Sequence, residues 1–226
     1  MDSPDLVVGF LMRNRPEYTR RTLESFVRQF GKVRWEGWYV DDASIDQEGM
    51  RALAEGYGMK PLIRNLKTKG CCRSSLDMAG RLSEKYSPET LFLYLQNDFE
   101  FLRPVPFEAI LALLEDRPDV GWVRLAGKWN SGVDKPRIKE DWIPEIPPAQ
   151  WLDCEYQGEF FELGKSYFCF NPPSILPLGT FYFIMQGAKN EREAALNAKE
   201  LCKWTARVAE NVAVHIGDEK TDAFRA

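Results

Sequence analysis

The segment LVVGFLMRNRPEYTRRTLESFVRQF, residues 6–30, joins an apolar run to a segment with helical periodicity. The apolar run, residues 6–12, predicts a buried β-strand. Pro16 suits the first turn of the helix that follows, because a backbone N–H at that position has no partner within the helix. One face of that helix carries four residues at a spacing of four, namely Tyr18, Thr22, Phe26 and Phe30. A buried strand that runs into an amphipathic helix is a building unit of helix-covered sheets.

The same alternation continues through the first half of the chain. Apolar runs predict further strands at residues 37–42, 59–65, 91–96 and 120–126. Helical patterns separate them at residues 46–58, 71–86 and 105–116. Strands joined by helices of this length predict an α/β fold with a mostly parallel sheet that is covered by helices on both faces.

The second half of the chain has a different texture. Residues 128–151 are rich in proline, tryptophan and charge, and they predict a long ordered loop of the kind that often carries function. Strand-like runs follow at residues 158–163 and 166–170, and residues 171–179 are rich in turn formers. The last strong helical pattern spans residues 189–208, and a final strand with a tail follows at 211–220.

Bulk composition excludes several classes of protein. The 226 residues are 44% hydrophobic and 13% aromatic, which excludes a disordered chain. A net charge of -4 and a pI near 5.3 argue against tight non-specific binding to nucleic acid. The five cysteines form no C-x-x-C pair, and therefore predict neither a zinc site nor a disulfide framework. No apolar run approaches the ~20 residues of a membrane span, and MDSPDLVV lacks the basic start of a signal peptide, so we expect a cytoplasmic protein.

Polar side chains gather where three of the predicted strands end. In open α/β sheets, ligands bind outside the carboxyl ends of the strands. The segment LYLQNDFEF, residues 93–101, alternates apolar side chains along an expected extended strand that also carries acids and an amide. The polar residues at the strand ends are Arg13, Asn14, Arg15, Asp41, Asp42, Asn97, Asp98 and Glu100. Basic groups beside acids that can hold a hard cation suit a nucleotide diphosphate. Neither G-x-G-x-x-G nor G-x-x-x-x-G-K-[ST] is present, which disfavours a dinucleotide enzyme or an ordinary ATPase.

Five segments taken together resemble a known family. They are FLMRNRPEYTRRTLESFVRQ, YVDDASID, LYLQNDFEF, KNERE and VAVHIG. In this order they resemble glycosyltransferases of the GT-A fold, and especially the inverting family 2 enzymes that use nucleotide sugars. The resemblance runs from residue 6 to about residue 217. It implies one GT-A, Rossmann-like domain over residues 1–226, with a nucleotide-sugar-binding half at 1–126. The remaining half, 127–226, would bind the acceptor and contribute a closing helix and a histidine tail.

The resemblance also implies the roles of individual residues. A divalent cation, Mn²⁺ or Mg²⁺, would bridge the diphosphate of the donor, for which a UDP-sugar is expected. Its ligands would be Asp98, Glu100 and His215. The donor would be bound by Arg13, Arg15, Asp41, Asp42, Lys69, Arg73 and Asn97, with Asp41 or Asp42 on the base or ribose. Glu191 or Glu193 would be the base that deprotonates a hydroxyl acceptor. Residues 128–151 and 170–177 would shape the acceptor side.

Other interpretations of the same residues remain open. Asp98 can be a solvated acid at a strand end, Asp41 and Asp42 can merely cap the next helix, and Glu191 and Glu193 can be ordinary surface charge. At the level of the whole chain, a nucleotidyltransferase or a non-catalytic sugar-nucleotide-binding protein are alternatives. The acceptor class is open among glycans, small molecules, proteins and a modified nucleic-acid base, the last reached by extruding the base from its helix.

Overall fold

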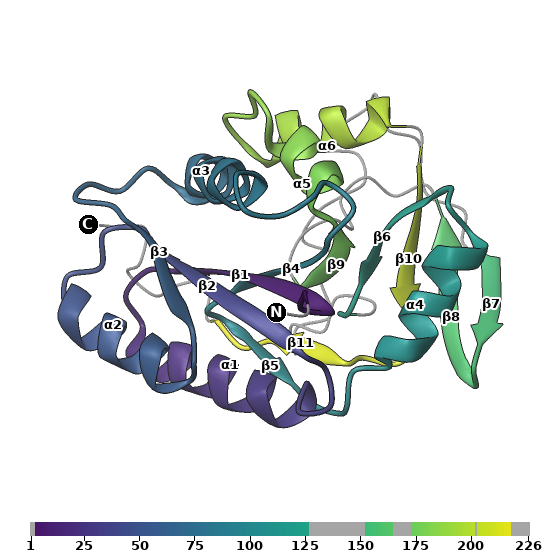
Figure 1. The fold of residues 1–226 in the computed structure, drawn as a ribbon, viewed down its shortest axis with the longest axis horizontal. Helices are drawn as coiled ribbons and strands as arrows, with labels where there is room; N and C mark the ends of the chain where they lie inside the picture. The colour runs from purple at the N-terminus through teal and green to yellow at the C-terminus, as the bar shows by residue number, and fades with distance from the viewer. Residues whose placement is uncertain (1–2, 127–151, 165–172, 202, 218–226) are drawn as a thin grey trace.

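The computed structural model of the chain describes residues 3–126, 152–164, 173–201 and 203–217 (Figure 1). Its strands are β1 (Leu6–Met12), β2 (Trp35–Asp41), β3 (Lys60–Arg64), β4 (Leu91–Gln96), β5 (Phe99–Phe101), β6 (Val120–Arg124), β7 (Leu152–Tyr156), β8 (Glu159–Gly164), β9 (Ser174–Pro177), β10 (Trp204–Val208) and β11 (Ala213–His215). Its helices are α1 (Pro16–Gln29), α2 (Gln47–Gly56), α3 (Cys71–Ser83), α4 (Phe107–Asp116), α5 (Leu178–Met185) and α6 (Glu191–Glu200).

A nine-stranded sheet runs through the molecule in the order β3-β2-β1-β4-β9-β6-β10-β8-β7. The first four strands are parallel, as the alternating pattern of the first half predicts. Beyond β4 the sheet is mixed, because β9 is antiparallel to both β4 and β6 while β10 is parallel to β6. The chain is therefore an α/β protein whose parallel strands bring the ends of β1, β2 and β4 to one edge.

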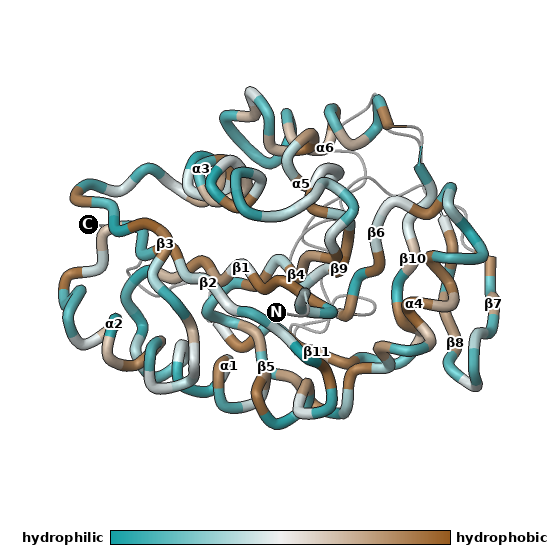
Figure 2. The backbone as a smooth tube through the Cα atoms, viewed as in Figure 1, coloured by the Kyte–Doolittle hydropathy of each residue, from teal (hydrophilic) through white to brown (hydrophobic). Residues whose placement is uncertain are grey.

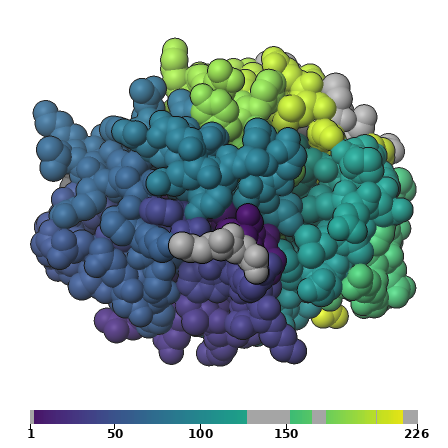
Figure 3. Space-filling model, viewed as in Figure 1, coloured from purple at the N-terminus to yellow at the C-terminus, as the bar shows by residue number. Residues whose placement is uncertain are grey.

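Helices cover both faces of this sheet, as expected. Helices α1 and α2 lie on one side, and α3, α5 and α6 lie on the other (Figure 1). Every residue of β1 is buried, and its side chains alternate between the two cores: Val8, Phe10 and Met12 pack with α1, whereas Val7 and Leu11 face α3. The central strands are accordingly among the most hydrophobic parts of the chain (Figure 2). Side chains fill the space between the ribbons (Figure 3).

Two predictions about the second half are wrong. The helix expected over residues 189–208 ends at Glu200, and residues 204–208 form strand β10 instead. The helix buries alanines at positions 194, 195 and 198, whereas β10 is held by ladders to both β6 and β8. The residues expected to form turns at 171–179 include β9, and the helix α5 begins at Leu178. Residues 128–151 and 166–170 lie outside the described residues.

The segment 93–101 is also not one extended strand. Strand β4 ends at Gln96, and the chain turns at Asn97 and Asp98. Strand β5 then leaves the main sheet and pairs antiparallel with β11 in a small second sheet. Because of this pairing, the residues that follow Ala213 are brought back to the turn at the end of β4.

Among the described helices, none has both the length and the apolar character that crossing a membrane requires.

Candidate functional site

A crevice lies at the carboxyl ends of β1 and β4, beside the first turn of α3. The predicted site residues that line it are Arg13, Arg15, Asp42, Asn97 and Asp98, and they are joined by Gly70, Cys71 and Gln96. This is the edge of a parallel sheet at which ligands of α/β proteins bind. Each of the three polar strand ends therefore contributes to one place, although Asn14, Asp41 and Glu100 do not line it.

The turn between β1 and α1 has an unusual backbone. Asn14 and Arg15 both lie in the left-handed region, with φ of 51° and 56°. Residues other than glycine adopt this conformation at a cost, and they keep it only where the surroundings hold it. The amide nitrogen of Asn97 supplies part of that support, because it donates to the carbonyl oxygen of Asn14 at 3.1 Å and to Thr19 Oγ1 at 2.9 Å. Asn97 thus fixes the turn from which Arg13 and Arg15 extend.

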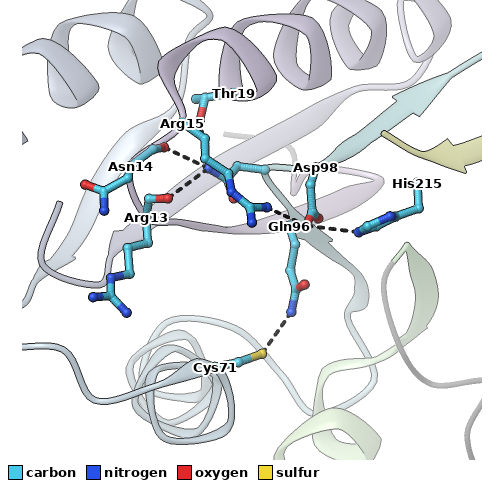
Figure 4. Close-up of polar contacts among 9 residues, drawn as sticks. Arg13, Asn14, Arg15, Thr19, Cys71, Gln96, Asp98 and His215 are labelled. Carbon is cyan, nitrogen blue, oxygen red and sulfur yellow. Dashed lines mark hydrogen bonds and ion pairs between the residues drawn. The ribbon is translucent and has the colours of Figure 1, made fainter. Parts of the chain in front are cut away.

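Asp98 is the point at which three distant segments meet. Its Oδ2 atom lies 3.3 Å from Nη1 of Arg15 and 3.1 Å from Nε2 of His215 (Figure 4). The backbone N–H of Ile216 donates to the carbonyl oxygen of Asp98 at 2.8 Å, which fastens the tail to the turn. The ring of Phe99 contacts the His215 imidazole edge-on at 5.2 Å between centroids. Asp98, Arg15 and His215, which we call the Asp98 triad, therefore form one polar cluster.

Of the two acidic residues expected to bind a cation here, only Asp98 is positioned to do so. Asp98 Oδ1 is buried and has no hydrogen-bond partner among the described residues, so this oxygen is available as a ligand. The third expected ligand, Glu100, is not beside Asp98, because its carboxylate pairs with Arg21 of α1 at 2.5 Å. Within the described ranges no three His, Cys, Asp or Glu residues converge on a point where an ion could sit. Asp98 and His215 fit a divalent cation whose other ligands are phosphate oxygens and water, as is usual for Mg²⁺.

The two neighbouring aspartates at the end of β2 have different environments. Asp42 accepts hydrogen bonds from five donors on α3 and the segment that leads into it: the backbone N–H groups of Lys69 and Gly70, and the side chains of Asn65, Thr68 and Ser74. Burial by itself raises the pKa of Asp42, but these hydrogen bonds outweigh it and hold the pKa below its usual value. Asp42 is therefore an anchor for the loop before α3.

Asp41 has far fewer partners. Its Oδ1 accepts from the backbone N–H of Ser44 at 2.9 Å, whereas its buried Oδ2 has no partner among the residues described. Burial raises the pKa of Asp41. The helix that follows is capped by Asp46, whose Oδ1 accepts from the Gly49 N–H, so neither Asp41 nor Asp42 serves as its cap.

Lys69 and Arg73 do not line the crevice. Both side chains pair with Asp77 on the exposed side of α3, at 2.6 Å for Lys69 and 3.6 Å for Arg73. The backbone of this segment is closer to the site than its charges are, since Gly70 lines the crevice with a φ of 82°. A side chain at that φ is strained, and the glycine before the helix is the sequence signal for this close approach.

Glu191 and Glu193 stand at the start of α6 and differ in what they bind. Glu193 makes a variant of the capping box: Asn190 Oδ1 accepts from its N–H at 3.0 Å, and its Oε2 accepts at 2.9 Å from the N–H of Lys189, the residue before the N-cap. Glu191 is exposed, yet the protein around it displaces enough water to raise the pKa of its carboxyl. Burial raises the pKa of Cys71 to about 11, and the charges of Glu191 and Asp98 add to that effect.

A polar network behind the crevice is not signalled by any motif. The hydroxyl of Tyr94 contacts Ser75 Oγ at 2.8 Å and Cys71 Sγ at 3.2 Å. The amide nitrogen of Gln96 donates to that hydroxyl at 2.8 Å. It also donates to Cys71 Sγ at 2.9 Å (Figure 4). The network joins β4 to the first turns of α3. The raised pKa of Cys71 favours its protonated thiol in this network.

The fold is the GT-A fold. Among solved structures, it is similar to GalNAc-T7 with UDP, GalNAc and Mn²⁺ at a TM-score of 0.64, with 12% identity over 96% of this chain and 44% of that one. S. aureus TarS gives a TM-score of 0.61, with 12% identity over 94% of this chain and 36% of TarS. For TarS 1–349 the TM-score is 0.59, with 13% identity over 93% of this chain and 60% of that one. TarS and GalNAc-T7 are glycosyltransferases of the GT-A type.

This chain thus spans between 36% and 60% of the length of the chains that it resembles. At 12–13% identity, the likeness establishes the fold. No protein-family model matches the sequence, and no curated protein matches it.

Proposed function

We propose that the chain is a metal-dependent glycosyltransferase that moves a sugar, with inversion, from a UDP-sugar to a hydroxyl acceptor. The observation that carries this proposal is the Asp98 triad, which lies at the carboxyl edge of the parallel strands of a GT-A fold. GalNAc-T7, which has the same fold, was solved with UDP, GalNAc and Mn²⁺, and that supports the choice of nucleotide and metal. Residues 1–126 would bind the donor, and residues 127–226 would bind the acceptor, within one domain.

The proposed donor contacts follow from which polar atoms are still available. Arg13 and Arg15 line the crevice and can meet a diphosphate through charge-assisted hydrogen bonds. The oxygens of Asp42 are already bonded, whereas Asp41 retains a buried oxygen without a partner among the described residues. Asp42 lines the crevice and Asp41 does not, so the base or ribose contact is proposed for Asp41 or Asp42, with the unpartnered oxygen of Asp41 as the acceptor if the donor reaches it.

Asp98 and His215 would hold the divalent cation on the protein side. When bound, such a cation supplies Lewis-acid stabilisation of the charge that grows on the leaving diphosphate, an effect of several kcal/mol. The contribution of the protein is to fix these two ligands. The β11–β5 ladder and the Ile216–Asp98 backbone hydrogen bond do so by holding the tail against the turn after β4.

Glu191 is the proposed general base. Glu193 is committed to its capping box, whereas the Glu191 carboxylate is exposed and has a raised pKa, which makes it a stronger proton acceptor. It would remove the proton of the acceptor hydroxyl as that oxygen attacks the anomeric carbon. The bond from that carbon to the diphosphate oxygen breaks on the opposite side, and the sugar is inverted. A single base suffices for this displacement.

The acceptor is proposed only as a hydroxyl compound, and a cytoplasmic location remains a prediction from the sequence. Binding of the donor is therefore the decisive experiment. Calorimetric titration with UDP, other nucleoside diphosphates and a panel of UDP-sugars should show tight binding in Mn²⁺ and weak binding in chelator. Slow release of sugar from the bound donor would then demonstrate catalysis. Binding without any turnover would favour the non-catalytic alternative, and the absence of nucleotide binding would refute the proposal.

A further inference from the structure

Arg15 pairs with one of the two oxygens of the Asp98 carboxylate. Its guanidinium contacts Oδ2 of Asp98 through a single nitrogen, Nη1, at 3.3 Å, and the two side chains are only 13% and 15% exposed. Strong arginine–carboxylate pairs have two parallel N–H···O hydrogen bonds and shorter distances. The pair between Arg15 and Asp98 is therefore a weak one of its kind. Arg15 Nε is buried and has no hydrogen-bond partner among the described residues. Arg15 thus retains capacity for a better partner.

The backbone around Arg15 gives the side chain a fixed origin. Its left-handed φ belongs to the turn that Asn97 supports, so a change of partner must occur by rotation of the side chain. The guanidinium lies 5.7 Å from the centroid of the Tyr18 ring. Gly217 closes the other side: a Cβ placed there would lie 3.1 Å from both Arg15 Nη1 and Asp98 Oδ2. The ion pair is therefore enclosed between α1 and the tail.

A divalent cation that approaches Asp98 alone meets two obstacles. It is repelled by the positive charge of Arg15 a few ångströms away, and this repulsion is strong because the site is largely shielded from water. Among the described residues it also finds one carboxylate and one imidazole, since Glu100 is held by Arg21. A cation with so few protein ligands depends on phosphate oxygens to complete its shell.

A diphosphate removes both obstacles at once. It offers the guanidinium a bidentate anionic partner within the same crevice, and it adds oxygen ligands for the cation. When Arg15 turns to the phosphate, Asp98 Oδ2 loses its contact with the guanidinium and keeps that with His215, the other expected ligand of the cation. We propose that Arg15 competes with the divalent cation for Asp98, so that the cation binds tightly only after the diphosphate has drawn Arg15 away. The inference rests on the proposed function, in that it takes a nucleoside diphosphate as the ligand.

The consequence is reciprocal coupling between the two ligands. If the diphosphate raises the affinity for the cation by some factor, the cation must raise the affinity for the diphosphate by the same factor. Substitution of Arg15 by an uncharged residue should reduce the factor by which each ligand raises the affinity for the other. It should strengthen cation binding in the absence of nucleotide while weakening nucleotide binding.

Electron paramagnetic resonance of free Mn²⁺ tests this with the intact chain. For the unchanged protein, we expect saturating UDP to raise Mn²⁺ affinity at least tenfold. Arg15→Gln should raise Mn²⁺ affinity without UDP about fivefold or more and shrink the effect of UDP to a few-fold. Arg15→Lys keeps the charge and should keep Mn²⁺ binding weak without UDP. Arg20→Gln is the matched control, because it removes a positive charge from α1 at an exposed position outside the crevice, and its partner Glu17 is not an expected metal ligand.

The outcomes separate the inference from the function that it presupposes. If the unchanged protein shows the UDP effect but Arg15→Gln leaves Mn²⁺ affinity without UDP unchanged, the competition is refuted and the proposed function stands. Equal increases for Arg15→Gln, Arg15→Lys and Arg20→Gln would also refute it. If UDP and the other nucleoside diphosphates bind neither with nor without Mn²⁺, the proposed function fails and the inference fails with it. Thermal unfolding of each variant checks that it is folded.

Discussion

The Asp42 carboxylate accepts a hydrogen bond from the backbone N–H of Gly70 at 3.0 Å, and this contact ties the end of β2 to the start of α3. The neighbouring N–H of Lys69 donates to the same side chain at 2.9 Å. The two bonds orient the backbone of the loop whose glycine lines the crevice. The geometry of the crevice therefore depends on a carboxylate that has no acceptor capacity left for a ligand.

Asp42→Asn should lower the free energy of unfolding by about 3 kcal/mol, because an amide nitrogen would face donors and leave buried groups unsatisfied. Chemical denaturation measures this. The pKa of Asp42 is lowered in the folded protein, so its stabilising contribution is complete above the unfolded pKa of 3.8 and is lost as the pH falls through the folded value. The variant should therefore show a weaker loss of stability in acid than the unchanged protein. An unchanged unfolding midpoint would contradict the anchoring role.

Asp41→Asn should behave in the opposite way. The variant retains an oxygen for the Ser44 N–H and no longer buries a charged oxygen without a partner, so its stability should stay within about 1 kcal/mol of the unchanged protein. UDP binding should weaken by roughly tenfold or more, since the carboxylate no longer accepts from the ligand. Calorimetry gives the affinity. Full UDP affinity would remove Asp41 from the donor site.

Asn97→Asp should damage the turn between β1 and α1. The substitution is isosteric, but it replaces an N–H₂ donor by an oxygen that faces the carbonyl of Asn14 and the hydroxyl of Thr19. A loss of about 2–4 kcal/mol is expected from the unsatisfied and repelling groups. UDP binding should fall too, because Arg13 and Arg15 lose their fixed origin. Denaturation and calorimetry together check this, and a variant of normal stability would contradict the support of the turn by Asn97.

Asp98→Asn and Glu100→Gln should separate the two acids of the segment 97–100. The first removes the carboxylate that meets His215 and should abolish the effect of Mn²⁺ on UDP binding. The second breaks only a contact with Arg21 on α1, so UDP affinity in Mn²⁺ should change less than about twofold. Titrations with metal and with chelator measure both. A large loss with Glu100→Gln would restore Glu100 as a metal ligand.

Glu191→Gln should leave donor binding intact while transfer falls by roughly 10²–10⁴-fold, the usual contribution of a general base. The base acts as the carboxylate, and burial raises its pKa above 4.5, so transfer by the unchanged enzyme should increase as the pH rises through that raised value. Glu193→Gln is the control, because glutamine can also close a capping box. Its rate should remain within a few-fold. The reverse pattern would make Glu193 the base.

The parallel half of the fold could be predicted because each strand there is an apolar run and each helix carries apolar residues at helical spacing. The sequence indicated the positions of Asp41, Asp42 and Asp98 because strand ends are readable from where apolar runs stop. It did not show that Asp42 is saturated while Asp41 is not. That difference arises from the loop at residues 65–70, which reaches the carboxylate only after folding.

The errors in the second half also have physical reasons. Proline and glycine at positions 173, 177 and 179 are typical of turns, yet Pro177 precedes the first turn of α5, where its lack of an N–H costs nothing. Helix α5 is apolar at most positions and so lacks an amphipathic period. Strand β10 follows α6 after only a few residues, so the sequence shows no break between them. Residues 204–208 form a strand because they pair with β6 and β8, which are distant in sequence.

The place of β9 in the sheet constrains the order in which the chain can be assembled. It follows β6 in sequence but lies between β4 and β6, so β6 cannot join the sheet until the ribosome has passed Pro177. Strands β1 to β4 need no such later segment, and their contacts close shorter loops. We expect a nascent chain to form the crevice wall first. The histidine beside Asp98 arrives last, so an incomplete chain does not acquire the cation side of the site.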